Sequence, residues 1–406
     1  MLPSDPTLAI NGGKAVFAEN ELASLVPPFP RLYPETEKRL LEVYNSRQWS
    51  GCGKYEKLLM EEFAAFQGAE YAVWMSNGTT TLQCALLALG IGRGDEVIVP
   101  GVTWIATAQA PLYVGATPVI VDIDPDTMCM DPVRFEEAIT PRTKAVIPVH
   151  LYSALANMDE INRIAAKYGI RVIEDCAHAH GAKQHGKGAG TMGCYGSFSF
   201  QMTKLMTGGE GGCLVTNDEK LADYALRTSH IGKSLLFPEE PLPTGLECHQ
   251  YRMTEFQLAV IYDQLQHQAE LMRERQEAVQ FILDFIKDIP SIQLQRSAFS
   301  DDERGYYFFT FLLQKEFLKE GITRKDIFDM LKAEGIQLGV GWGVPLYKSI
   351  FWNIPEEKYI RKDTFHSEDI MANRLMCIMH PLLYSGKNVL ERWASALRKV
   401  MLASTK

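Results

Sequence analysis

The sequence has no excess of positive charge and no long hydrophobic run. Its 41 lysine and arginine residues are outnumbered by 50 aspartate and glutamate residues, for a net charge of -9, and the basic residues form no stripe that could follow a phosphate backbone. No apolar stretch approaches the roughly 18 residues that a membrane-spanning helix needs, and the N-terminus lacks the pattern of a secretion signal. We therefore expect a cytoplasmic protein that binds neither nucleic acid nor membrane.

Cysteine pairs at metal-binding or redox spacing are also missing. The eight cysteines are spread along the chain, and none forms a Cys-x-x-Cys pair. His178, His180 and His185 follow Cys176 closely, but no second pair of ligands stands at a standard spacing. We expect reduced cysteines that fill the interior, and no metal site.

The length and the pattern of apolar runs predict an α/β protein with two lobes. At 406 residues, the chain exceeds the roughly 250–300 residues at which one core usually divides. From about residue 70 to 230, β-branched runs alternate with helical stretches, which predicts a mainly parallel sheet with helices on both faces and ligand chemistry at the carboxyl ends of its strands. The runs are Glu96–Pro100, Thr117–Asp122, Ala145–Val149 and Val172–Asp175.

The second half of the chain predicts a smaller α+β lobe. Three prolines within Pro238–Thr244 predict an exposed loop. Helical spacing then predicts a long helix from about Glu255 to Ile289 that leads into the second lobe, where Tyr306–Phe311 is typical of a strand. We place a large domain with an N-terminal arm at residues 1–265 and a small C-terminal domain at residues 266–406.

The densest chemical signal surrounds Lys204, which stands between a hydroxyl-bearing strand and a glycine cluster in the segment 197–212. A lysine amine forms an imine with an aldehyde cofactor once burial or nearby cations lower its pKa. Asp175 ends a buried strand, where a carboxylate can pair with a protonated pyridine nitrogen and make the ring an electron sink. A solvated lysine and an ordinary helix cap are the alternatives for these two residues taken singly.

Two further segments fit a planar, phosphorylated cofactor. A predicted strand, Tyr71–Trp74, leads into a helix that begins near Gly78, Thr79 and Thr80. Backbone N–H groups and hydroxyls at the positive end of a helix can hold a phosphate, although such residues also serve as helix caps. Trp104 follows a strand end, where its ring can either stack on a cofactor or pack in the core.

Taken together, these features resemble the fold-type I enzymes that use pyridoxal 5'-phosphate (PLP). More narrowly, the chain resembles the DegT/StrS family of sugar aminotransferases from about residue 30 to 390, and most of all its cyclitol (scyllo-inosose-type) aminotransferases and aminohydroxybenzoate synthases. The segments that carry this resemblance are Leu8–Gly13, Ala177–Gly181, Phe200–Gln201, Lys204–Thr207 and Tyr251–Phe256.

The resemblance implies a role for each matching residue. Lys204 occupies the position of the lysine that carries PLP as a Schiff base, and Asp175 that of the partner of the pyridine nitrogen. Trp104 occupies the position of the aromatic residue that stacks on the ring. The positions that bind the phosphate are those of Gly78, Thr79 and Ser199, with Thr80 beside them.

Two positions depart from the family pattern. His178 stands where many members have a glutamine near the phenolic oxygen of the cofactor, and an imidazole can still donate a hydrogen bond there. Gln250 stands where the family usually has an asparagine that reaches the phosphate from the neighbouring subunit, so the donor is kept on a longer arm. The resemblance therefore implies a homodimer with shared active sites.

The implied activity is that of a PLP-dependent aminotransferase. The enzyme would move an amino group from glutamine or glutamate to a keto-sugar or keto-cyclitol, in carbohydrate or secondary-metabolite biosynthesis, with Lys204 as the base that moves the α-proton. A dehydrating and aromatising enzyme like the aminohydroxybenzoate synthases stays open, whereas the sugar dehydratases of the family typically replace the lysine with histidine. A non-catalytic PLP-binding regulator is a third reading. We expect the substrate pocket to be lined by Gly339–Tyr347, Trp49–Gly51 and the proline-rich loop.

Overall fold

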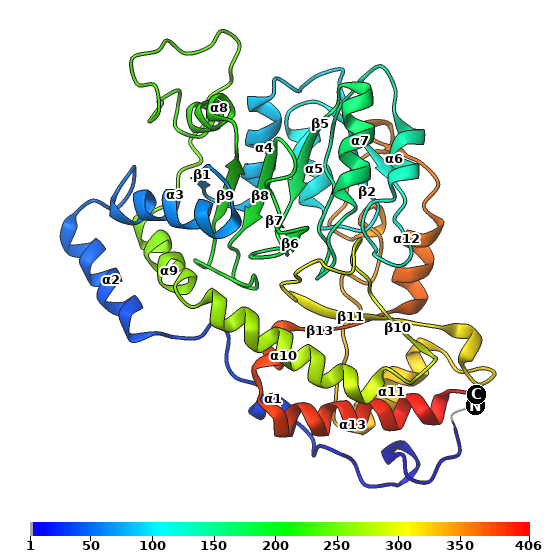
Figure 1. The fold of residues 1–406 in the computed structure, drawn as a ribbon. Coiled ribbons are helices and arrows are strands. Elements are labelled where there is room, and N and C mark those ends of the chain that lie inside the picture. The colour runs from blue at the N-terminus through cyan, green and yellow to red at the C-terminus, as the bar shows by residue number, and fades with distance from the viewer. Residues whose placement is uncertain (1–2) are drawn as a thin grey trace.

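A computed structural model describes residues 3–406 and shows a large α/β part joined to a smaller one (Figure 1). The large part is built on an eight-stranded sheet with the order β1-β9-β8-β5-β4-β2-β3-β12. Only β9 runs against its neighbours, β1 and β8, so the predicted mainly parallel sheet is confirmed. The strands are β1 (Tyr71–Met75), β2 (Glu96–Pro100), β3 (Thr117–Val121), β4 (Thr143–Val146), β5 (Arg171–Asp175), β8 (Tyr195–Ser199), β9 (Gly212–Thr216) and β12 (Ile360–Arg361).

Helices cover both faces of this sheet, which explains why its strands are almost continuously apolar. In β2, Val97 and Val99 pack on the side of α4, α5 and α8, whereas Ile98 packs on the side of α6 and α7. A third cluster lies between α3, α9 and the strands at the β1 edge. These helices are α3 (Lys54–Gln67), α4 (Gly78–Ala88), α5 (Ala106–Tyr113), α6 (Pro132–Ala138), α7 (Met158–Tyr168), α8 (Glu219–Ser229) and α9 (Glu255–Leu265).

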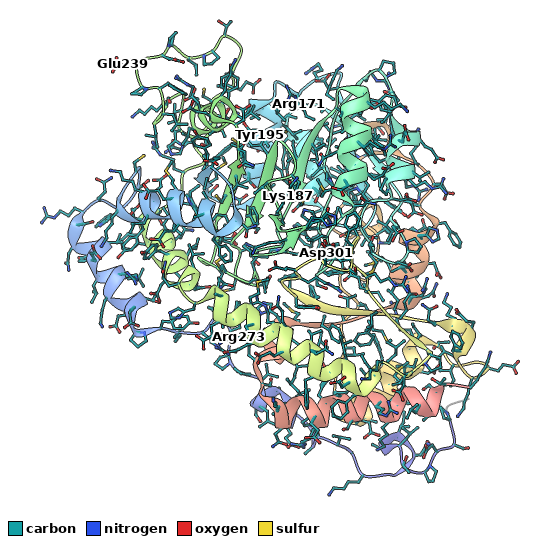
Figure 2. The ribbon with its side chains drawn as sticks, in the orientation of Figure 1. Arg171, Lys187, Tyr195, Glu239, Arg273 and Asp301 are labelled. Atoms are coloured by element: carbon teal, nitrogen blue, oxygen red, sulfur yellow. The ribbon has the colours of Figure 1, made fainter. Side chains whose placement is uncertain are left out.

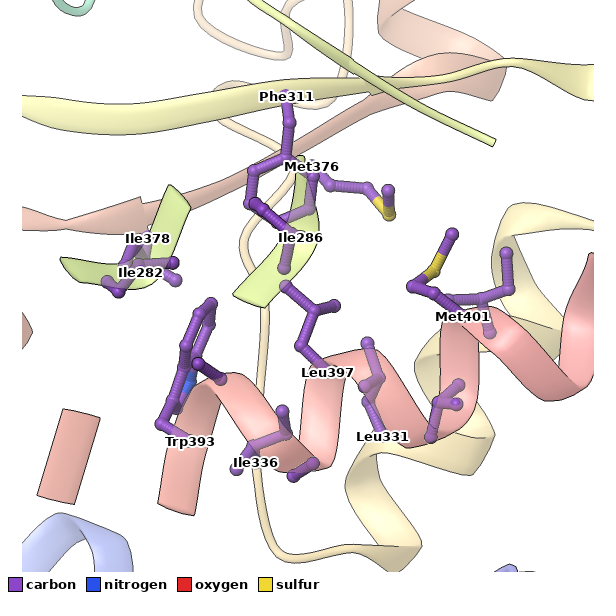
Figure 3. Packing of buried hydrophobic residues seen from close by; sticks show 14 of the residues in the cluster. Ile282, Ile286, Phe311, Leu331, Ile336, Met376, Ile378, Trp393, Leu397 and Met401 are labelled. Atoms are coloured by element: carbon purple, nitrogen blue, oxygen red, sulfur yellow. The ribbon is translucent and has the colours of Figure 1, made fainter. Parts of the chain in front are cut away.

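The smaller part places a three-stranded antiparallel sheet against long helices. Its core joins Ile282 of α10, Phe311 of β11 and Trp393 and Leu397 of α13 (Figure 3). The two long helices, α10 and α13, lie side by side (Figure 1). The elements are α10 (Gln268–Ile286), β10 (Ile292–Leu294), β11 (Phe308–Leu313), α11 (Arg324–Ala333), β13 (Leu375–Met379) and α13 (Lys387–Ser404).

The remaining elements are short or peripheral. They are α1 (Glu21–Leu25), α2 (Pro34–Ser46), α12 (Phe365–Asp369), the hairpin strands β6 (Lys183–Gln184) and β7 (Lys187–Gly188), and the single turns η1 (Ala9–Asn11), η2 (Lys315–Phe317), η3 (Leu346–Lys348), η4 (Glu356–Lys358), η5 (Ile370–Arg374) and η6 (His380–Tyr384).

The structure differs from the expected elements mainly in three places. β11 spans Phe308–Leu313 rather than the expected Tyr306–Phe311. β4 ends at Val146, short of the expected Val149, because Pro148 has no N–H with which to continue a strand ladder. The expected long helix is divided into α9 and α10 at residues 266–267. Both side chains that flank this break, Gln264 and Gln268, are hydrogen-bonded to backbone oxygens of Thr207 and Leu205.

The proline-rich loop is exposed, as expected, and carries neither helix nor strand. Figure 2 shows Glu239 on this loop, far from the body of the molecule. Within residues 3–406, no helix combines the length and the apolar character that crossing a bilayer requires. The boundary between residues 265 and 266 stays a prediction, and β12 returns from the C-terminal side of it to pair with β3.

Candidate active site

A cavity of about 640 Å³ opens at the carboxyl ends of the parallel strands. Residues at or just after the ends of β1, β2, β5 and β8 line this cavity. The C-terminal part of the chain contributes Tyr307 and Trp342 to its wall. All the predicted site residues except Gln250 line it. They are Gly78, Thr79, Thr80, Trp104, Asp175, His178, Ser199 and Lys204.

Asp175 is the last residue of β5 and is buried at the base of this cavity. Its Oδ2 accepts a hydrogen bond from the Thr107 hydroxyl at 2.8 Å, and its Oδ1 accepts one from the Ala177 N–H at 3.2 Å. Burial raises the pKa of the carboxyl, while these two bonds and the nearby Lys204 act in the opposite direction. The carboxylate is thus held on the strand end and presented to the cavity.

Lys204 lies on the loop between β8 and β9, and burial lowers the pKa of its amine to about 8. The loop is supported by Gln264, near the junction of α9 and α10. The Gln264 amide accepts from the Thr207 N–H at 3.0 Å and donates to the Thr207 carbonyl at 2.7 Å. An amine with this pKa is available as a nucleophile or base near neutral pH, unlike an ordinary surface lysine.

His178 presents a neutral ring to the same cavity. Its Nδ1 accepts a hydrogen bond of 3.2 Å from the Tyr152 N–H, so the ring proton belongs on Nε2. Burial, followed by the nearby Lys204, lowers the pKa of this imidazole well below its ordinary value. The ring is therefore a neutral hydrogen-bond donor, which fits the role expected beside a phenolic oxygen.

The first turn of α4 forms the opposite wall. Asn77 caps the helix, because its Oδ1 accepts from the N–H groups of Thr79 at 3.1 Å and Thr80 at 2.9 Å. Among the described residues, no hydrogen-bond partner meets the Gly78 N–H or the Thr79 hydroxyl. A Cβ at Gly78 would lie 2.8 Å from the Cβ of Ser199, so glycine is required where these two predicted phosphate residues meet.

Trp104 is not a core residue, because 44% of it is exposed. Its ring centroid lies 6.4 Å from that of Trp342 and 5.9 Å from that of Phe351. The tryptophan therefore offers an accessible aromatic face beside the cavity, and the alternative of core packing is excluded.

Some predicted positions do not reach the cavity of a single chain. Gln250 is exposed and forms an isolated bridge with His230, so its contact with the phosphate of a neighbouring subunit stays a prediction. Of the expected pocket segments, Gly339–Tyr347 contributes Trp342, whereas Trp49–Gly51 and the proline-rich loop are absent from the lining.

The clustered histidines do not form a group of potential metal ligands in residues 3–406. Cys176 instead lies with His150 and Glu174, and the atoms of that group are already engaged. Glu174 accepts from His150 at 2.9 Å and from three backbone N–H groups. A second group, Cys52, Glu56 and His230, contributes no residue to the lining of the cavity.

Sequence reasoning missed several cavity residues. Gln83 lies one turn along α4 from Thr79 and Thr80, so helical spacing could have identified it. Tyr307 carried no signal, because it belongs to an aromatic run that reads only as a strand. The other missed residues include Thr103, Tyr113, Gln201, Thr203 and Glu210.

This donor set fits PLP. The cavity combines an amine of lowered pKa, a buried carboxylate on a strand end and free donors at a helix N-terminus. Together with the sheet, it defines the class of fold-type I PLP enzymes. The solved structure of 3-amino-5-hydroxybenzoic acid synthase is similar, with a TM-score of 0.82 and 28% identity over 96% of this chain and 100% of that one. A GDP-4-keto-6-deoxy-D-mannose-3-dehydratase of E. coli with bound hydrated PLP has a TM-score of 0.78 and 27% identity, covering 93% and 98% of the two chains.

Residues 30–391 match the DegT/DnrJ/EryC1/StrS aminotransferase family, and the chain belongs to this family. Among its relatives, the L-glutamine:2-deoxy-scyllo-inosose aminotransferase of Micromonospora echinospora is 39% identical over 74% of this chain and 73% of that protein. The predicted family, enzyme class and cofactor are thus confirmed, and the chain is a PLP-dependent aminotransferase.

Proposed function

We propose that this aminotransferase transfers the amino group of L-glutamine to a keto-cyclitol, with Lys204 and Asp175 as its catalytic residues. The named specificities of its relatives support this choice, because they join L-glutamine to scyllo-inosose or to its deoxy forms. Glutamate is the competing donor, and a nucleotide-linked keto-sugar is the competing acceptor.

The charge of the cavity is the observation that favours a keto-cyclitol over a nucleotide-linked keto-sugar as the acceptor. Among the described residues that line it, Lys204 is the only cationic side chain, because His178 is held neutral. A nucleotide-linked sugar has a diphosphate that proteins usually meet with arginine or lysine. The lining instead offers hydroxyls, amides and aromatic faces, with Glu210 and Asp175 as its carboxylates. Such a surface suits a neutral polyol.

Each residue then has a defined task. When bound, PLP supplies an electron sink that acidifies the C–H bond of the attached amine. The Lys204 amine, with a pKa of about 8, can accept and return a proton at that carbon. Asp175 would offer its carboxylate to the pyridine nitrogen, and His178 would donate a hydrogen bond from Nε2 to the phenolic oxygen. The residues that would hold the phosphate are Gly78, Thr79, Thr80 and Ser199, with Trp104 against the ring.

We further propose a homodimer in the cytoplasm. Gln250 is exposed and does not line the cavity of its own chain, which suits a contact with the cavity of a second copy. All eight cysteines are free, which suits a reducing compartment. Sedimentation would measure the oligomeric state, and mixing inactive Lys204→Ala with inactive Gln250→Ala subunits would restore activity if the sites are shared.

The role of Lys204 is tested by visible absorbance. The purified protein with PLP should absorb in the visible range, and sodium borohydride should attach the cofactor permanently to the peptide that contains residue 204. Lys204→Ala should lose both properties. Lys233→Ala, which changes an exposed lysine, is the matched control. Retention of the same spectrum in Lys204→Ala would disprove this role.

The substrate is tested by separate half-reactions. The PLP form is mixed with glutamine or glutamate, and the resulting amine form is mixed with keto-cyclitols or nucleotide-linked keto-sugars. We expect faster reaction with glutamine and with a keto-cyclitol. Preference for a nucleotide-linked sugar would overturn the choice of acceptor. Formation of a product with aromatic ultraviolet absorbance would instead favour a dehydrating activity like that of 3-amino-5-hydroxybenzoic acid synthase, the protein of the similar structure.

A further inference from the structure

We propose that Tyr307 is a positioning residue for Lys204, which holds the free amine against its ring and fixes the preceding residue through its hydroxyl. The inference rests on the proposed role of Lys204. It assigns a function in the reaction to a residue of the C-terminal part of the chain.

The aromatic face of Tyr307 meets the lysine directly. Nζ of Lys204 lies 4.8 Å from the centroid of the Tyr307 ring, within the distance at which a ring attracts a cation. Tyr307 is only 5% exposed, so its ring is largely shielded from bulk solvent. The ring therefore favours the protonated amine, in opposition to the burial that lowers the pKa of Lys204.

The same ring lies against His178. The two ring centroids are 4.2 Å apart, and their planes differ by 20°. Because His178 is fixed by the Tyr152 N–H, it restricts the orientation of Tyr307 in turn. Tyr307 thus contacts both the neutral donor of the site, His178, and the Lys204 amine.

The hydroxyl of Tyr307 reaches the residue before the lysine. It lies 2.9 Å from the Thr203 hydroxyl, and the Thr203 carbonyl accepts from Nε2 of His380 at 3.1 Å. Both contacts come from the C-terminal part of the chain, just before β11 and at the start of η6. The loop that carries Lys204 is therefore held at Thr203 by Tyr307 and His380, and at Thr207 by Gln264.

These contacts have a consequence for catalysis. A lysine released from the cofactor has four rotatable methylenes and could turn away into the open cavity. Contact with the Tyr307 ring keeps the amine at one place and makes its return faster. The hydroxyl contact fixes the backbone from which the side chain starts, so the ring and the hydroxyl make separable contributions.

Four variants separate these contributions. Tyr307→Leu removes the ring and the hydroxyl, Tyr307→Phe removes only the hydroxyl, and Thr203→Ala removes the partner of that hydroxyl. Phe308→Leu is the matched control, because Phe308 packs edge-on against Tyr307 at 4.8 Å but, unlike Tyr307, does not line the cavity that contains the lysine. The full-length chain, stripped of PLP, is reductively methylated with ¹³C-formaldehyde and a borane or cyanoborohydride reductant, and the Lys204 resonance is identified by its absence in Lys204→Ala.

The first readout is the pKa of the Lys204 amine in this cofactor-free chain. Loss of the ring should lower it by about 0.5–1 pH unit, the size expected of a partly desolvated cation–π contact. Tyr307→Phe and Phe308→Leu should leave it unchanged. An unchanged or raised pKa in a folded Tyr307→Leu protein would overturn the role of the ring.

The second readout is the half-reaction with glutamine in the loaded enzyme. Tyr307→Phe and Thr203→Ala should lower its maximal rate by about two- to tenfold, with little change in the concentration for half-saturation. Both variants are expected to fold. This measurement therefore tests the hydroxyl contact between Tyr307 and Thr203 even if Tyr307→Leu fails to fold. Equal rates in wild type and both variants would overturn it. Failure of the proposed role of Lys204 would be distinguishable from failure of the proposal for Tyr307. Lys204→Ala would then keep its visible absorbance, whatever the pKa of the amine.

Discussion

The Thr107 hydroxyl donates a hydrogen bond of 2.8 Å to Oδ2 of Asp175, although the two residues are 68 positions apart in the chain. Thr107 lies in the first turns of α5, and Asp175 ends β5. The bond stabilises the charged form of the carboxyl and opposes the effect of burial on its pKa.

Replacing Thr107 by valine should therefore raise the pKa of Asp175. The carboxylate would then be lost at a higher pH, so the acid limb of the pH–rate profile should move upward. We expect a rate loss of about tenfold or more near pH 7, because one hydrogen bond to a charged group contributes about 1.5–3 kcal/mol. Asp175→Asn, which removes the charge at every pH, should lose more activity and show no such limb. An unshifted acid limb in Thr107→Val would contradict the role of Thr107 in lowering the pKa of Asp175.

The pKa of about 8 for Lys204 predicts how the cofactor-free chain takes up PLP. Only the neutral amine attacks an aldehyde, so the rate should rise about tenfold per pH unit below pH 8 and level off above it. A lysine with an ordinary pKa near 10.4 would keep accelerating to pH 10. Stopped-flow absorbance between pH 6.5 and 9.5 would separate the two profiles.

Gly78→Ala should weaken PLP binding. The added Cβ would lie 2.8 Å from the Cβ of Ser199, so the two walls of the phosphate site must separate. We expect the Kd for PLP to rise more than tenfold, a cost of at least about 1.4 kcal/mol. Ser199→Ala is the companion variant, because it removes a hydroxyl without adding volume and should raise Kd less. Titration by tyrosine and tryptophan fluorescence would measure both, and an unchanged Kd in Gly78→Ala would place the phosphate elsewhere.

The core of the smaller part should depend strongly on α13. Leu397 is fully buried there among Trp393, Ile286 and Phe311 (Figure 3). Leu402 on the same helix is 45% exposed. Leu397→Ala should lower the free energy of unfolding by about 2–5 kcal/mol through lost burial and a residual cavity. Leu402→Ala should change it by no more than about 0.5 kcal/mol. Urea unfolding of the two variants in parallel would show whether this difference exists.

Much of the sheet could be predicted because its strands are buried on both faces. This burial makes them short apolar runs, as in Glu96–Pro100, which is β2 without change. The break between α9 and α10 could not be predicted, because it coincides with side-chain bonds from Gln264 and Gln268 to a loop about 60 residues earlier. Helical periodicity carries no information about such contacts.

The sequence by itself determined which residues could serve a PLP enzyme, since Asp175 ends a strand, Gly78 begins a helix, and Lys204 follows a strand and precedes a glycine cluster. The chemistry of these residues depends on their type and on local spacing, both of which are written in the chain. Only the tertiary structure decided their environment. It places the Thr107 hydroxyl within hydrogen-bonding distance of Asp175 and the Tyr307 ring against the Lys204 amine. These partners are distant in sequence and come together only because the sheet gathers its strand ends and the C-terminal part of the chain closes over them.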